Sequence, residues 1–231
     1  MRFKTISLAL ALALAGVGAA QAQGFGGLAG KLPGIPGRSA APAGDVDAQV
    51  AAFNEDATEI RAAVFFSVEQ ILAAVGTKEQ IAKVRVNLDA SNKVTNPKEL
   101  GSLQGAVLKT EMQQAQEALN AKDATEKLEK MSPEMRAKVG KSMLALGIAA
   151  LRMPNTIKTG QGIVQGAAAN PMSIPKVIPV KDGLAMFADI LPKLPTLVQA
   201  GFKMMRDVKM DPGNPSADAK PVVDNNISFP A

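Results

Sequence analysis

An apolar side chain returns every three or four residues from Val46 to Ala74, and this unbroken spacing constrains the fold more than any other feature of the chain. A spacing of this kind places its members on one side of an α-helix. We therefore predict a first helix of about 30 residues, which would extend for about 45 Å. Gly76 follows the last apolar position and is expected to end this helix.

The residues after Gly76 also have helical periodicity, and no segment alternates polar and apolar side chains over a useful length, so we expect little or no sheet. Thr77 and Asn96 are predicted helix N-caps, because each is followed three residues later by a Gln or Glu that can complete a capping box. The segment from Pro133 to Met153 has two nearly opposite apolar faces, which predicts a central helix covered by neighbours on both sides. Pro154 is expected to close it.

Small residues and prolines shape the remaining helical segments. Gly162 and Gly166 in the next segment, Asn155 to Ala169, have the spacing that permits close approach of two helices. Pro192 and Pro195 should divide the segment from Asp182 to Lys209 into two short helices. The predicted fold is therefore all-α: a bundle of five to seven helices with a long N-terminal helix, a central helix apolar on two faces, Pro-kinked C-terminal helices and disordered ends.

The N-terminus indicates export. Residues 1–4 are basic, the stretch from Ile6 to Ala20 is apolar and uncharged, and Ala20-Gln21-Ala22 has the small residues of a signal-peptidase site. We predict a signal peptide over 1–22, cleavage after Ala22, and a periplasmic or secreted protein. Residues 23–44 are rich in Gly, Pro and Ala and predict a flexible linker. Residues 45–210 form the predicted helical domain, and 211–231 a disordered tail.

The composition excludes many kinds of site. The chain has no histidine, cysteine, tryptophan or tyrosine, which removes the commonest general base, the thiol nucleophile and the usual zinc ligands. We expect no catalytic residues, no metal site and no cofactor, and hence not an enzyme. Basic residues without aromatic stacking partners also argue against nucleic-acid binding.

Three sequence patterns resemble catalytic or metal-binding sites but have simpler structural interpretations. Ser173-Ile-Pro-Lys176 matches the S-x-x-K of penicillin-binding proteins, but the other motifs of that family are missing or in reverse order. Glu55, Asp56 and Glu59 cluster on the first predicted helix, where we expect a solvated face. The methionines resemble thioether ligands, but Met135, Met143 and Met153 have the spacing of core residues and no histidine accompanies them. None of the three is therefore predicted to be a site.

Charge divides the chain into two halves. No acidic residue occurs from 135 to 181, whereas seven basic residues do. A half that is apolar and basic could hold an acyl chain and an anionic head group, or contact a membrane surface. The ligand-binding residues that we predict lie in this segment and are Arg136, Lys138, Lys141, Arg152 and Lys158.

The sequence thus predicts an exported, non-catalytic binding protein with a lipid or the membrane surface as its partner. The alternative is an envelope scaffold or interaction protein that binds a protein partner through helix–helix contacts. That alternative depends on the long apolar stripe of the first helix, which could extend into a coiled coil.

Overall fold

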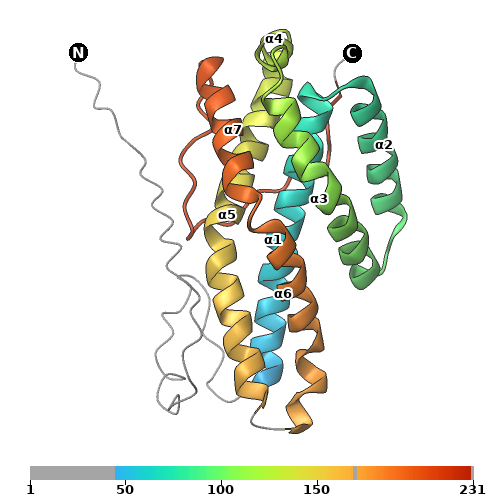
Figure 1. Ribbon diagram of the computed structural model, residues 1–231, viewed down its shortest axis with the longest axis vertical. Coiled ribbons are helices and arrows are strands. Elements are labelled where there is room, and N and C mark those ends of the chain that lie inside the picture. Colours follow the sequence, from blue (N-terminus) through green and yellow to red (C-terminus); the bar gives the residue numbers. More distant parts are fainter. Residues whose placement is uncertain (1–44, 169–170, 230–231) are drawn as a thin grey trace, which may run out of the picture. The chain divides into compact units, whose positions relative to one another are not determined.

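The structure, a computed structural model, describes residues 45–168 and 171–229, and all regular elements within these ranges are helical (Figure 1). The predicted all-α bundle is confirmed. The predicted signal peptide and linker lie outside the described residues. The elements are α1 (Val46–Val75), α2 (Lys78–Lys93), α3 (Pro97–Leu119), α4 (Ala124–Glu129), α5 (Pro133–Ala168), the 3-10 helices η1 (Pro171–Ser173) and η2 (Pro175–Val177), α6 (Ile178–Ile190) and α7 (Leu194–Asp207).

Each of the first three helices begins directly after a residue whose side chain caps it. The Asp45 carboxylate accepts a hydrogen bond from the Ala48 N–H at 3.1 Å. Thr77 and Gln80 form a reciprocal capping box, in which each side chain accepts a hydrogen bond from the backbone N–H of the other. The Asn96 side chain caps the first turn of α3. These bonds satisfy N–H groups that have no partner within their own helix.

Helix α1 is the centre of the bundle. It packs most extensively against α5 and α3, and it also contacts α2, α4 and α6 (Figure 1). From Ala63 to Val75 its residues are buried on every side, except for the half-buried Phe66. The long apolar stripe is therefore covered within the chain, and the coiled-coil extension that motivated a scaffold protein would need a different surface.

Helix α5 does not end at Pro154, and this prediction was wrong. The helix continues to Ala168 and has Pro154 in its interior. Proline removes one helical hydrogen bond, at a cost of about 3 kcal/mol. Here Pro154 is exposed, whereas Thr156, Gly160 and Ile163 on the next turns are buried. Packing of these turns within the bundle offsets the lost bond, which the local sequence does not reveal.

Glycine permits close packing in this part of the bundle, but not at the predicted positions. A Cβ at Gly162 or Gly166 would meet nothing within 4 Å, so the predicted close approach is wrong there. Instead, the Phe53 ring of α1 lies between Gly160 of α5 and Gly183 of α6. A Cβ at Gly183 would approach this ring to 2.9 Å. These two glycines make room for the Phe53 ring.

The C-terminal part of the chain has two short helices followed by an extended segment. The break between α6 and α7 is at the predicted prolines. Residues 211–229 form no helix or strand, as expected for a tail, but they contact the bundle. Ile227 is buried, and Lys220 Nζ lies 3.2 Å from Glu59 Oε1 of α1. The described part of the tail is therefore a packed segment.

None of the helices in the described ranges is both long enough and apolar enough to cross a lipid bilayer.

Candidate functional site

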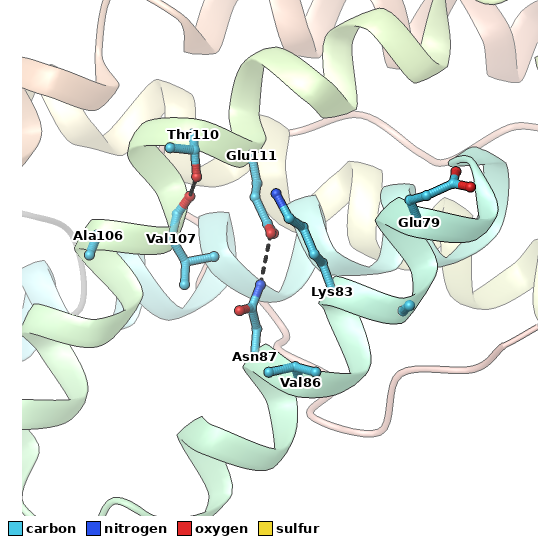
Figure 2. Close-up of a pocket in the computed structure, with 9 residues that line it drawn as sticks. Glu79, Lys83, Val86, Asn87, Ala106, Val107, Thr110 and Glu111 are labelled. Carbon is cyan, nitrogen blue, oxygen red and sulfur yellow. Dashed lines mark hydrogen bonds between the residues drawn. The ribbon is translucent and has the colours of Figure 1, made fainter.

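An open groove of about 510 Å³ lies between α2 and α3. Figure 2 shows its residues projecting from both helices. Ala82, Val86, Ala106 and Val107 supply its apolar lining. Polar side chains line the rest, and they are Glu79, Lys83, Asn87, Thr110 and Glu111.

The groove exists because α2 is only lightly attached to the rest of the bundle. Among its 16 residues, Val84 and Ser91 alone are buried. Val86 leaves 66 % of its surface exposed, which is unusual for a valine in a helix of this bundle. The apolar side chains of the groove therefore face a space that no other described residue fills.

Two carboxyl groups are buried beneath the groove, and one amide joins them. Glu69 of α1 is fully buried, and Glu111 of α3 is 4 % exposed. The Asn87 Nδ2 of α2 donates to Glu111 Oε1 at 2.8 Å, a bond drawn in Figure 2, and to Glu69 Oε1 at 3.2 Å. This cluster, Glu69–Asn87–Glu111, connects the three helices around the groove.

The environment of this cluster favours a protonated carboxyl. Burial, the negative charge of Glu111 and a hydrogen bond to Glu111 together raise the pKa of Glu69 to about 9, although the hydrogen bond from Asn87 acts in the opposite direction. Burial also raises the pKa of Glu111, while the bonds from Asn87 and Glu69 and the charge of Lys83 act against this rise. At neutral pH, Glu69 is therefore the protonated member of the pair.

A proton held between the carboxyls also satisfies their remaining oxygens. Among the described residues, no N–H or hydroxyl donor reaches the buried Oε2 atom of Glu69 or of Glu111. Because an unsatisfied buried oxygen is costly, a proton from Glu69 shared with Glu111 is the arrangement that suits both. The pair then has one negative charge, which interacts favourably with the positive charge of Lys83 in the groove.

The cluster is poorly suited to hold a metal ion. Within the described residues, Asp, Glu, His and Cys form no group of three that could bind one. Glu69 and Glu111 are only two ligands, and the raised pKa of each favours a protonated carboxyl over the carboxylate that a metal ion needs. The arrangement can instead fix the position of α2 and supply hydrogen-bonding groups at the base of the groove.

The basic residues predicted to bind a ligand do not lie in this groove, and the structure does not bring them together. All five are on α5, and the first and last, Arg136 and Lys158, are 22 residues apart. At 1.5 Å per residue, this separation is about 33 Å. Lys141 and Lys158 are exposed, and Lys138 binds the C-terminal segment at Ser228 Oγ, 2.8 Å away.

Arg152 is part of a buried ion pair between α5 and α1. Its guanidinium contacts Asp56 Oδ1 at 2.8 Å and Glu59 Oε2 at 3.2 Å. The side chains of Arg152 and Asp56 are each only 7 % exposed. Of the acidic cluster for which we expected a solvated face, Glu55 is exposed, Glu59 is half-buried and Asp56 is buried. Because α5 covers this side of α1, its arginine neutralises the carboxylates.

The two remaining sequence patterns have structural roles. In the S-x-x-K string, Lys176 Nζ pairs with Asp47 Oδ2 at 2.6 Å, and Ser173 is buried in η1. Met143 and Met153 are fully buried in the core, as the spacing predicted. A methionine core also agrees with the scarcity of aromatic residues in this half of the chain.

Glu69, Asn87 and Glu111 were not among the predicted site residues, although the sequence around Glu69 contains one signal. Glu69 is the only charged residue from Ala62 to Thr77, a stretch in which every other residue except Gln70 is apolar or small. A lone charge in a helix buried on all sides must be neutralised or paired. Glu111 and Asn87 have no comparable signal, because their meeting depends on how α2 and α3 pack on α1.

Comparison with protein families, with curated proteins and with solved structures finds no match, so the interpretation of the site depends on its geometry.

Proposed function

We propose that this chain is an exported, non-catalytic binding protein that holds a lipid in the groove between α2 and α3. The groove itself is the observation that carries the proposal. Its volume of about 510 Å³ lies within the range of roughly 300–1,000 Å³ typical of small-molecule sites. Its apolar side chains, such as Val86 and Val107, gain by being covered with an acyl chain.

The charges of the groove favour a particular class of head group. Lys83 supplies a positive charge, and Glu79 and the carboxyl pair at Glu111 supply negative ones. A head group with a net negative charge would be repelled by these carboxylates. A neutral or zwitterionic head group can pair with both signs and is therefore the better fit.

Two further observations support binding without catalysis. Glu69, the group with the most strongly raised pKa, is fully buried and therefore out of reach of a ligand in the groove. The chain also lacks histidine and cysteine, which most often act as base or nucleophile. Export is supported by the signal-peptide pattern of residues 1–22, which a lipid carrier of the envelope would need.

Filling the groove should abolish lipid binding. Ala106 is exposed on α3 and lines the groove, so Ala106→Trp adds a large side chain there without entering the core. We expect wild-type protein to bind palmitoyl-lysophosphatidylcholine below its micelle concentration with one lipid per chain. The Ala106→Trp variant should bind at least tenfold more weakly. Isothermal titration calorimetry measures both.

The matched control is Ala185→Trp, which places the same side chain on an exposed position of α6 away from the groove. Its affinity should equal that of wild type. Lysophosphatidylglycerol, which has a net negative head group, should bind more weakly than lysophosphatidylcholine. Equal binding by wild type and Ala106→Trp, or no binding of either lipid, would contradict the proposed function.

A further inference from the structure

The end of the C-terminal segment occupies a surface built by three helices. Gln70 of α1 binds the backbone of Ser228 in both directions. Its Nε2 donates to the Ser228 carbonyl at 3.3 Å, and its Oε1 accepts from the Ser228 N–H, also at 3.3 Å. The amide of Gln70, which is 2 % exposed, thus acts like the edge of a neighbouring strand.

Two basic side chains complete the surface. Lys138 of α5 donates from Nζ to Ser228 Oγ at 2.8 Å and to the Asn226 carbonyl at 3.4 Å. The Cζ atom of Arg85, on α2, lies 4.2 Å from the centre of the Phe229 ring, which is a cation–π contact. We call Gln70, Arg85 and Lys138 the tail-binding surface.

These contacts distinguish one kind of peptide from others. The bonds from Gln70 recognise an extended backbone whatever its side chain, as in strand addition. The Lys138 contact selects a small hydroxyl side chain, and Arg85 selects an aromatic ring after it. Ile227, which precedes Ser228, is buried at 8 % exposure. The recognised pattern is therefore an apolar residue, serine and an aromatic residue in an extended chain.

The segment buries few of its residues for its length. Among residues 211–229, Ile227 is the only one that is buried. Segments with little buried apolar surface open locally at a small fraction of the global unfolding free energy. The segment can therefore leave the surface while the helices remain folded.

We propose that the tail-binding surface is a peptide-binding site, that the C-terminal segment is its intramolecular ligand, and that it binds an extended apolar–Ser–aromatic peptide of a partner when this segment leaves. The site is separate from the lipid groove. Arg85 projects from α2 toward the C-terminal segment, whereas Lys83 and Asn87 line the groove. The inference does not depend on the proposed lipid.

The test uses the full chain and a fluorescein-labelled synthetic peptide of residues 218–231, followed by fluorescence anisotropy. Ser228→Pro in the protein removes the N–H that Gln70 accepts and the hydroxyl that Lys138 contacts, so it releases the attached segment. The Ser228→Pro protein should bind the wild-type peptide at least tenfold more tightly than wild-type protein does, because the attached segment no longer competes.

A second substitution identifies the surface. Adding Arg85→Glu to the Ser228→Pro protein should weaken peptide binding at least tenfold, because the Phe229 ring loses its cation. Arg85 is exposed, so this change leaves the core of the bundle intact. Lys78→Glu is the matched control, since it makes the same charge change on α2 without a contact to the segment, and it should leave affinity unchanged.

Two results would overturn the inference. One is a Ser228→Pro protein that binds the wild-type peptide no better than a peptide with the same proline substitution. The other is equal loss of affinity with Arg85→Glu and Lys78→Glu. Circular dichroism at 222 nm verifies that each variant retains its helices, so weak binding cannot be attributed to unfolding.

Discussion

Replacing Glu69 by glutamine should stabilise this protein at alkaline pH, by roughly 2–4 kcal/mol at pH 8. Glutamine has nearly the shape of the protonated carboxyl. Its oxygen can accept the bond from Asn87 Nδ2, and its amide can donate toward Glu111. The substitution removes the need to keep a proton on a buried acid. Urea denaturation of both proteins from pH 5 to pH 9 measures the effect.

The direction of this effect follows from the two states of the carboxyl. The pKa of Glu69 is about 9 in the folded protein and near 4.5 in an unfolded chain. Between these values the folded state keeps a proton that the unfolded state has released. The free energy of unfolding of wild type therefore falls as pH rises, by roughly 1 kcal/mol per pH unit. The raised pKa of Glu111 acts in the same direction.

The free energy of unfolding of the Glu69→Gln variant should depend much less on pH than that of wild type. Glu129→Gln is the control, because Glu129 is exposed at the end of α4 and its substitution should leave the slope of wild type. Parallel pH profiles for wild type and Glu69→Gln would show that the buried carboxyl is ionised at neutral pH. That result would refute the shared proton.

Replacing Arg152 by methionine should destabilise the protein by roughly 3–5 kcal/mol. Methionine preserves much of the side-chain length but removes the guanidinium that neutralises Asp56 and Glu59. The Asp56 carboxylate would then be buried without that counter-charge. Chemical denaturation at pH 7 measures the loss.

Two comparisons separate charge from packing in this prediction. Lys158→Met removes a positive charge from an exposed position of the same helix and should change stability by less than about 0.5 kcal/mol. Adding Asp56→Leu to Arg152→Met should restore much of the stability, because an apolar pair replaces a buried ion pair at little cost. If the double variant is as unstable as Arg152→Met alone, the ion pair does not explain the loss.

Much of the fold could be predicted from the sequence because local signals specify it. The stripe from Val46 to Ala74 and the cap at Thr77 identify the helices and their starts, since both depend on neighbouring residues in the chain. Pro154 shows the limit of such signals. The local rule predicts a helix end there, but packing of the following turns against other helices keeps α5 continuous.

The candidate site could not be predicted in the same way. Its three polar residues, Glu69, Asn87 and Glu111, come from three helices and meet only because α2 and α3 both pack on α1. Two of the basic residues that the sequence singled out, Lys138 and Arg152, have other partners. Arg152, for example, pairs with Asp56, an acid almost one hundred positions earlier, and no local pattern connects the two.

The C-terminal segment shows a related limit. Its composition predicts a tail, and the absence of helix or strand agrees with that. Its attachment depends on the side chains of Gln70, Lys138 and Arg85 from three other helices. A contact of this kind becomes visible only when the helices that provide these side chains have been placed in space.

Native mass spectrometry of the protein purified from its own host tests the central claim, a lipid held between α2 and α3, most directly. We predict a mass above that of the chain alone by one lipid, and extraction should release a lipid with a neutral or zwitterionic head group. The Ala106→Trp variant from the same host should have no such adduct. A homogeneous, ligand-free mass for wild type, or the same adduct on both proteins, would contradict the account.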